Sequence, residues 1–234
     1  MQTGKDSSGG GAKLPLKNSV CKADCYTGFE EVTNAFSHGV GALLALAGSV
    51  VLVVLAALQG DPWRIVSFSI YGTTLVVLYL ASTLYHAINH PRAKTFFHVM
   101  DHVSIFLLIA GSYTPVTLIN MRGVWGWAIF GMVWTIALAG VILKVFFTGR
   151  HALISVFLYV GMGWLIIVAI HPLLVSMHLR GVALMAAGGV FYTAGLIFYA
   201  MKKMRYHHAV WHIFVMAGSA TQYLGFLLYV LPEI

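Results

Sequence analysis

Two pairs of polar side chains have the spacing of metal ligands. The segment HHAVWH, residues 207–212, opens an apolar run and places His208 and His212 four residues apart. On a helix, such residues lie on one face, so both imidazoles can reach one metal ion. Ser82 and His86 repeat this spacing. Because the chain has 11 histidines, chance spacing is the alternative to a metal site.

The composition shows what kind of elements must position these residues. Hydrophobic residues make up 59% of the chain and charged residues 9%, against about 45–50% and about 25% in soluble domains. This composition indicates an integral membrane protein. Seven windows are apolar enough to cross about 30 Å of hydrocarbon as helices. They are residues 32–60, 65–91, 103–121, 123–143, 152–170, 181–201 and 206–232.

We therefore expect an all-α fold, an integral membrane bundle of seven transmembrane helices over residues 30–234. Residues 1–29 are polar and rich in glycine and serine, which predicts a disordered cytoplasmic tail. The tail lacks the apolar core of a signal peptide, and the first helix should begin near Asn34. Its Cys21 and Cys25 suit free thiols in a reducing cytosol, with a disulfide or metal role as the alternative. Pro115 should kink the third helix near its far end.

The basic residues predict the orientation of the bundle. With a cytoplasmic N-terminus and the C-terminus outside, 11 of the 14 Lys and Arg residues lie inside, as the positive-inside rule requires. The inside set is Lys5, Lys13, Lys17, Lys22, Arg92, Lys94, Lys144, Arg150, Lys202, Lys203 and Arg205, and the outside set is Arg64, Arg122 and Arg180. Topology and contacts with anionic lipids thus account for the net charge of +7, and we expect no nucleic-acid partner.

This topology brings the polar residues to one layer. Ser82, His86, Asp101, His208 and His212 all fall at the cytoplasmic ends of their helices. Asp101 is the only acid expected at membrane depth, where an unpaired ionisable group is costly and functional by default. A helix N-cap or first-turn acid is its structural alternative. Three imidazoles with a carboxylate nearby form a zinc arrangement that keeps an open coordination position.

Four segments carry a family resemblance: EEVTNAFSHGVG (30–41), STLYHAINH (82–90), MDHVSIFLLIAGSYTP (100–115) and HAVWHIFVMAGSA (208–220). With them, the chain from residue 30 to the end resembles the bacterial hemolysin III family. That family belongs with the progestin and adipoQ receptors, including the adiponectin receptors, and more distantly with the alkaline ceramidases. The resemblance implies seven helices in the bacterial inner (plasma) membrane and a Zn²⁺ ion near the cytoplasmic face.

By motif position, the resemblance assigns the metal ligands to His86, His208 and His212 and a role beside them to Ser82 and Asp101. We place His102, Glu30, Asn34 and His38 in the surrounding shell, although His38 could equally serve polar packing between helices. His98 is an interfacial histidine in this interpretation. Relatives often carry a further histidine where this chain has Gln222, whose amide is a poor zinc ligand and is therefore left out.

Two main functional classes remain open. In the first, zinc activates a water molecule that Asp101 orients or deprotonates, Ser82 helps hold that water or a developing oxyanion, and an acyl lipid is hydrolysed as by a ceramidase. In the second, zinc is a structural link in a membrane sensor or fluidity regulator. The family name adds a third, a cytolysin. Membrane lipids are the expected partners in each case.

Overall fold

The computed structural model describes residues 26–147 and 152–232. These residues form helices joined by short turns, and the described part of the chain contains no strand. Most of the expected tail, with Cys21 and Cys25, lies outside the described residues, as does Glu233. The all-helical fold expected from the sequence is therefore confirmed for the described residues.

The helices follow one another with few intervening residues. In chain order they are α1 (Gly28–Gln59), α2 (Pro62–Ala87), α3 (Pro91–Pro115), the π-helix η1 (Val116–Asn120), α4 (Val124–Phe147), α5 (Ala152–Gly163), the 3₁₀-helix η2 (Leu165–Ala169), α6 (Ile170–Ser176), α7 (Leu179–Ala200) and α8 (His207–Tyr229).

Six helical segments are long and apolar enough to cross a membrane. They are Gly28–Gln59, Pro62–Ala87, Pro91–Asn120, Val124–Phe147, Leu153–Ser176 and Leu179–Ala200. α8 has a comparable length of 23 residues and packs against α1 and α7. Its first two turns carry His207, His208 and His212, and it is not among the six apolar segments.

Local sequence signals explain where α1 and α2 begin. α1 starts at Gly28, ahead of the expected Asn34, because Thr27 and Glu30 form a capping box in which each side chain bonds the other residue's backbone N–H. Gly60 then ends α1 in the left-handed region (φ 71°), where glycine carries no steric penalty. Asp61 caps α2 through the Trp63 N–H.

Two spans change helix type part-way along. α3 passes into η1 directly after Pro115, as a proline within a helix leads one to expect. The fifth span breaks after Gly163 and continues to Ser176, beyond the predicted end. Pro172 does not end it because that residue lies in the first turn of α6, where a missing N–H costs little. Tyr113 joins the two irregular regions, since its hydroxyl donates to the Gly163 carbonyl (2.9 Å) and accepts from the Ile166 N–H (3.0 Å).

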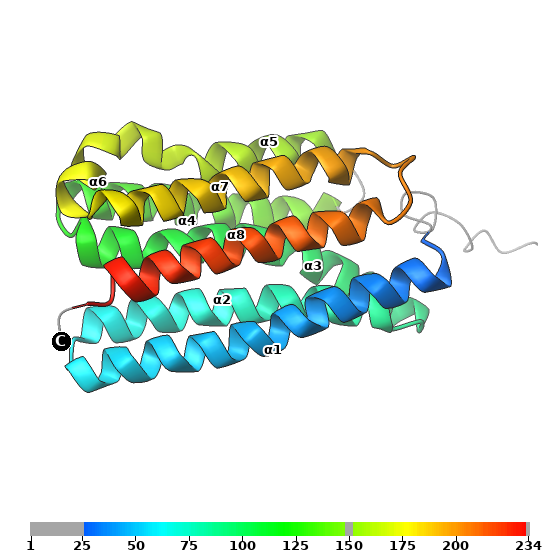
Figure 1. Ribbon diagram of the computed structural model, residues 1–234. Coiled ribbons are helices and arrows are strands. Elements are labelled where there is room, and N and C mark those ends of the chain that lie inside the picture. The colour runs from blue at the N-terminus through cyan, green and yellow to red at the C-terminus, as the bar shows by residue number, and fades with distance from the viewer. Residues whose placement is uncertain (1–25, 148–151, 233–234) are drawn as a thin grey trace, which may run out of the picture.

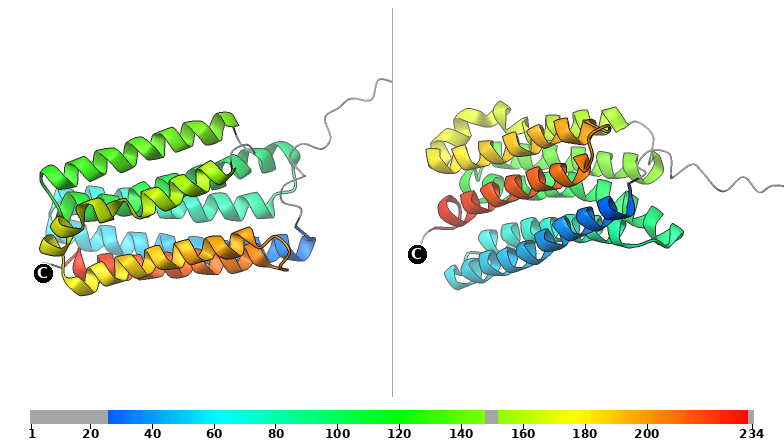
Figure 2. Two further views of the ribbon diagram at one scale, coloured as in Figure 1. Left: turned by 90° about the horizontal axis from the view of Figure 1, so that it is seen from above. Right: turned by 45° about the vertical axis from the view of Figure 1, so that its right-hand side comes forward.

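The long helices lie side by side, and α1 packs on α2 and α8, α2 on α3, and α7 on α8. One end of the bundle holds the start of α1, the turn between α2 and α3, and the loop between α7 and α8, whereas the C-terminus lies at the other end (Figure 1; Figure 2). Among the described basic residues, those assigned to the inside fall at the first end. Arg64, Arg122 and Arg180 fall at the second end, beside the turns that start α2, α4 and α7.

We expect the end that holds the start of α1 to face the cytoplasm, because most of the basic residues lie there. A reporter fused after Lys203 should then report a cytoplasmic location, and one fused after Arg122 or at the C-terminus should report the outside. The opposite sidedness would contradict the predicted orientation and would move the polar layer to the outer face.

Candidate metal centre

Three buried histidines from two helices meet at the end of the bundle that holds the start of α1. His86 lies in the last turn of α2, and His208 and His212 lie in the first turns of α8. Their exposed fractions are 2%, 5% and 0%. Each offers one nitrogen, and these three nitrogens all lie within 4.8 Å of one another. The structure thus brings together the three histidines that the spacing and the resemblance predicted.

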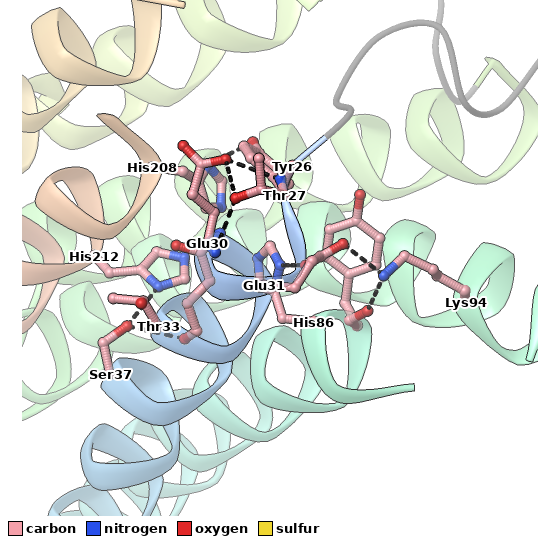
Figure 3. A network of polar contacts seen from close by, with 12 residues as sticks. Tyr26, Thr27, Glu30, Glu31, Thr33, Ser37, His86, Lys94, His208 and His212 are labelled. Atoms are coloured by element: carbon pink, nitrogen blue, oxygen red, sulfur yellow. Dashed lines mark hydrogen bonds and ion pairs between the residues drawn. The ribbon is translucent and has the colours of Figure 1, made fainter. Parts of the chain in front are cut away.

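The start of α1 holds each of these rings through its Nδ1 atom (Figure 3). The contacts join His86 to Glu31 Oε2 (2.5 Å), His208 to Tyr26 Oη (3.0 Å) and His212 to Ser37 Oγ (2.9 Å). Metal-binding histidines commonly use their second nitrogen in this way, because the bond fixes the orientation and the tautomer of the ring.

The partners determine which nitrogens keep a lone pair. The Glu31 carboxylate can only accept a hydrogen bond, so His86 donates its Nδ1–H. The Ser37 hydroxyl donates to the Asn34 carbonyl oxygen (2.9 Å), so it accepts from the Nδ1–H of His212. In both neutral imidazoles the proton therefore resides on Nδ1, and Nε2 presents a lone pair to the cluster.

The Nε2 atoms of His86, His208 and His212 are buried and have no hydrogen-bond partner among the described residues. A buried polar atom without a partner costs about 1–3 kcal/mol, and three such atoms face one another here. A zinc ion would satisfy all three, because zinc takes imidazole nitrogen at about 2.0–2.1 Å and three histidines leave a fourth position open. The residues present therefore fit this metal.

A second layer of contacts supports Glu31. Lys94 Nζ donates to Glu31 Oε1 (2.8 Å) and to the Tyr85 carbonyl oxygen (3.2 Å), and Figure 3 shows Glu31 between Lys94 and His86. The first turn of α3 thus helps orient a ring on α2. Because Glu31 is held from both sides, the His86 ring has little freedom to rotate.

Three further predicted residues surround the histidines. His38 stacks on His212 with ring centroids 3.4 Å apart and planes 12° apart. Both ring nitrogens of His38, the amide nitrogen and oxygen of Asn34 and the Ser82 hydroxyl are buried without a hydrogen-bond partner among the described residues. Ser82 lies one turn before His86 on the same face of α2. These unsatisfied polar atoms thus lie on the parts of α1 and α2 that also carry His86 and the partners of the histidine cluster.

Glu30 and Glu31 have different roles. Glu30, which we had placed beside the histidines, accepts from the Thr27 N–H (2.9 Å) and the Tyr206 N–H (3.1 Å). Tyr206 has a left-handed backbone (φ 58°), which is costly for a bulky residue, so Glu30 stabilises the loop that precedes His208. Glu31 is not among the residues predicted from the sequence, although it shares a helix face with Asn34 and His38 at spacings of three and four.

Asp101 and His102 line a cavity that reaches the histidine cluster. Asp101, 4% exposed, lies on its wall together with His208 and Tyr26. His102 also lines the cavity, and its Nδ1 contacts the His98 carbonyl oxygen (2.9 Å) within α3. The structure therefore places Asp101 in the same polar end as the cluster and places His102 beside it.

The cavity has a volume of about 160 Å³. Its walls come mainly from α3, α5, α7 and α8, and its middle part is aliphatic. The aliphatic lining includes Leu108, Ile109, Val156, Val160, Leu196 and Val215. Gln222 also lines it, but lies ten residues and thus about 15 Å along α8 from His212. Gln222 lies outside the group of three histidines, and its exclusion from the ligand set stays a prediction.

Comparisons with known proteins cover most of the chain. The model of the family described as "Haemolysin-III related" matches residues 26–223. "Hemolysin-3" of Bacillus cereus is 44% identical over 203 residues, which are 87% of this chain and 93% of that protein. "Hemolysin-3 homolog" of Bacillus subtilis (strain 168) is 44% identical over 200 residues, which are 86% of this chain and 94% of that protein. The "Monocyte to macrophage differentiation factor" of Homo sapiens is 27% identical over 215 residues, which are 88% of this chain and 85% of that protein. The matched span begins at Tyr26, so it includes every histidine partner on α1.

The first prediction from this geometry concerns metal content. Purified protein should retain about one zinc per chain, because three histidines supply the ligands. His208→Ala and His212→Ala should each lose most of it, as measured by elemental analysis after dialysis against a mild chelator. His178→Ala, at the opposite end of the bundle, should keep it. Full zinc in either cluster variant would show that the ligand set is wrong.

A second prediction separates the two neighbouring acids. Glu31→Gln should weaken zinc binding about 10- to 100-fold, because the carboxylate that orients His86 is lost. Glu30→Gln, one residue away on the same helix, should cost less zinc affinity than Glu31→Gln, because Glu30 bonds the backbone N–H groups of Thr27 and Tyr206 and not a ligand histidine. Competition against a fluorescent chelator measures both affinities. Equal losses in the two variants would refute a specific role for Glu31.

Proposed function

Because the chain belongs to the haemolysin-III related family and is an integral, multi-pass membrane protein, we propose that it is a zinc-dependent hydrolase. Its substrates are acyl lipids with an amide or ester linkage, as for ceramidases. In this proposal α8 is the seventh span, the N-terminus is cytoplasmic, and His86, His208 and His212 hold the metal.

The observation that carries the proposal is the cavity shared by the histidine cluster and an aliphatic wall. Asp101, His208 and Tyr26 lie at one end, and side chains such as Leu108 and Val215 line the adjoining part. Ligand sites typically combine an apolar pocket with a few convergent polar groups. An acyl chain along the aliphatic wall would bring its amide or ester carbonyl to the histidines.

Different residues of the chain have different roles in the proposed reaction. When bound, zinc supplies Lewis acidity, which polarises a carbonyl and lowers the pKa of water. Asp101 accepts a proton from the water that attacks the carbonyl carbon and returns it to the departing amine or alcohol as the C–N or C–O bond breaks. The Ser82 hydroxyl donates to the developing oxyanion. Glu31, Tyr26 and Ser37 keep the imidazole rings in place.

A second candidate function is a membrane sensor with a structural zinc. It is supported by the origin of the ligands, because His86 comes from α2, His208 and His212 come from α8, and their partners come from α1 and the residues before it. An ion there would join three helices. The name of the Bacillus cereus relative suggests a cytolysin, but the histidine cluster of this chain is buried inside the bundle, which favours the first two functions.

Asp101→Asn distinguishes the enzyme from the sensor. The variant should keep its zinc, since the three histidines remain, and should lose at least about 100-fold in hydrolysis, because an amide cannot take up the proton. Asp61→Asn is the control, since asparagine caps a helix as well as aspartate does and Asp61 caps α2 at the other end of the bundle. Release of fatty acid, zinc content and thermal unfolding should be measured on the same sample.

Two results would overturn parts of this proposal. A zinc-loaded parent protein that cleaves no long-chain amide or ester in lipid would exclude the hydrolase and leave the structural zinc. Unchanged hydrolysis in zinc-loaded Asp101→Asn would keep the enzyme but remove Asp101 from its mechanism.

A further inference from the structure

We infer that the cavity has a second polar subsite, at Gln222, which binds a hydroxyl group in the distal half of an acyl chain. The inference rests on the proposed function for the class of ligand, an acyl amide or ester, and adds a feature of its chain. It makes Gln222 a specificity-determining residue at the end of the cavity away from the histidine cluster.

One face of α8 extends from the histidine cluster to this subsite. Four residues of α8 line the cavity, and they follow one another at spacings of three, four and seven, which place them on the same side of a helix. They are His208, Trp211, Val215 and Gln222. A ligand that lies along this face therefore passes from a histidine of the cluster to Gln222.

The length of this face suits one acyl chain. Gln222 lies ten residues beyond His212 on α8, which is about 15 Å along the helix. This distance is about half of the roughly 30 Å hydrocarbon core of a bilayer, so it is close to the depth that the acyl chains of one leaflet fill. A ligand whose carbonyl lies at the histidines would bring the distal half of a long chain to Gln222.

Packing between α7 and α8 gives the level of Gln222 in the cavity. A β-carbon added to Gly188 would lie only 2.6 Å from Gln222 Cγ, so Gly188 leaves the space in which this side chain lies. The next residue of α7, Gly189, lines the cavity, and a β-carbon there would lie 3.5 Å from the Trp164 ring. Gln222 and Trp164 are therefore at about the same level.

The Gln222 amide differs from its polar neighbours in having an unsatisfied oxygen. Its Oε1 is buried and has no hydrogen-bond partner among the described residues. By contrast, Trp164 Nε1 donates to Thr193 Oγ1 (3.0 Å), and the hydroxyls of Tyr192 and Ser219 bond each other (2.9 Å). Burying an amide without a compensating hydrogen bond is costly. A polar group on a bound ligand would remove this cost.

The chemistry of the amide favours a neutral hydroxyl on the ligand. Oε1 requires a donor, and a hydroxyl donates as well as accepts, whereas a keto or ester oxygen only accepts. The last torsion of a glutamine side chain is broad, so the amide can turn to present its oxygen or its NH₂ group. Asp101 and Lys144 are the charged residues of the described lining, and they lie at the ends of α3 and α4 near the histidine cluster. A charged group at Gln222 would therefore be remote from any counter-ion of the lining, which makes it costly at this depth.

Two acyl amides that differ by one hydroxyl test this inference. N-ricinoleoyl ethanolamine is N-oleoyl ethanolamine with a hydroxyl in the distal half of the chain. The purified full chain in detergent should bind the ricinoleoyl amide about five- to tenfold more tightly, the effect of one hydrogen bond in a buried site. Displacement of tritiated N-oleoyl ethanolamine measures both affinities, and mass spectrometry verifies that the ligands remain intact.

Variants of Gln222 identify the source of the preference. Gln222→Met should lose the preference and keep the affinity for the oleoyl amide, because methionine is also unbranched and offers at most a weak acceptor. Gln59→Met is the matched control, since Gln59 is the other glutamine among the described residues and does not line the cavity. This control should keep the preference. If Gln222→Met does not fold, Gln222→Leu and the comparison of the two ligands on the parent protein still decide.

The position of the hydroxyl provides a second control. In N-(2-hydroxyoleoyl) ethanolamine the hydroxyl lies beside the carbonyl, where it cannot reach Gln222 while the carbonyl is at the histidines. The affinity for this isomer should therefore be the same in the parent and in Gln222→Met. A loss in the variant as large as that for the ricinoleoyl amide would contradict the proposed subsite.

Equal affinity of the parent for the ricinoleoyl and oleoyl amides would overturn the inference, as would a preference that survives in Gln222→Met. The outcome is separate from that of the proposed function, because binding does not require cleavage. A Gln222-dependent preference in a zinc-loaded protein that cleaves no long-chain amide or ester would exclude the hydrolase and keep the inference. Cleavage of both amides without such a preference would do the reverse.

Discussion

The structure depends on the pairing of each Nδ1 atom in the histidine cluster with a partner on α1 or directly before it. Because Glu31 and Ser37 can only accept from His86 and His212, they direct two Nε2 lone pairs to the same point. Lone pairs that face one another in a buried layer repel and remain unsatisfied unless a cation lies between them. The position of α1 against α2 and α8 therefore orients the histidine rings in addition to packing the helices together.

α1 and the residues directly before it contribute to the cluster at several positions. Tyr26, Glu31 and Ser37 contact the three ligand histidines, while Glu30 holds the backbone of Tyr206 at the start of α8. Glu30 of the capping box therefore has two roles. It caps α1, and it fixes the loop that precedes His208 and His212. The family match that begins at residue 26 includes all of these groups.

The sequence predicted those features that depend on local chemistry. Apolar runs located the helices, Gly60 and Pro115 marked a helix end and a change of helix type, and spacings of four paired His208 with His212. It did not predict the break after Gly163, because that break is stabilised by Tyr113 from another helix. Nor could it choose between Glu30 and Glu31, since adjacent acids point about 100° apart on a helix and only the position of α2 selects one.

The two ends of the cavity are built differently, and this difference suits an acyl lipid. At the polar end, regular helices position Asp101 and His208, and the Tyr26 hydroxyl contacts Nδ1 of His208 (3.0 Å), which suits the fixed geometry that the proposed reaction needs. At the far end, Tyr113, Gly163 and Trp164 line the cavity where α3 and α5 depart from α-helical geometry. Side-chain bonds replace part of the backbone ladder there, so the wall can adjust at smaller cost than an unbroken helix could. In the proposed hydrolase, a rigid polar end next to an adaptable apolar end would allow one chemistry to act on acyl chains of different lengths.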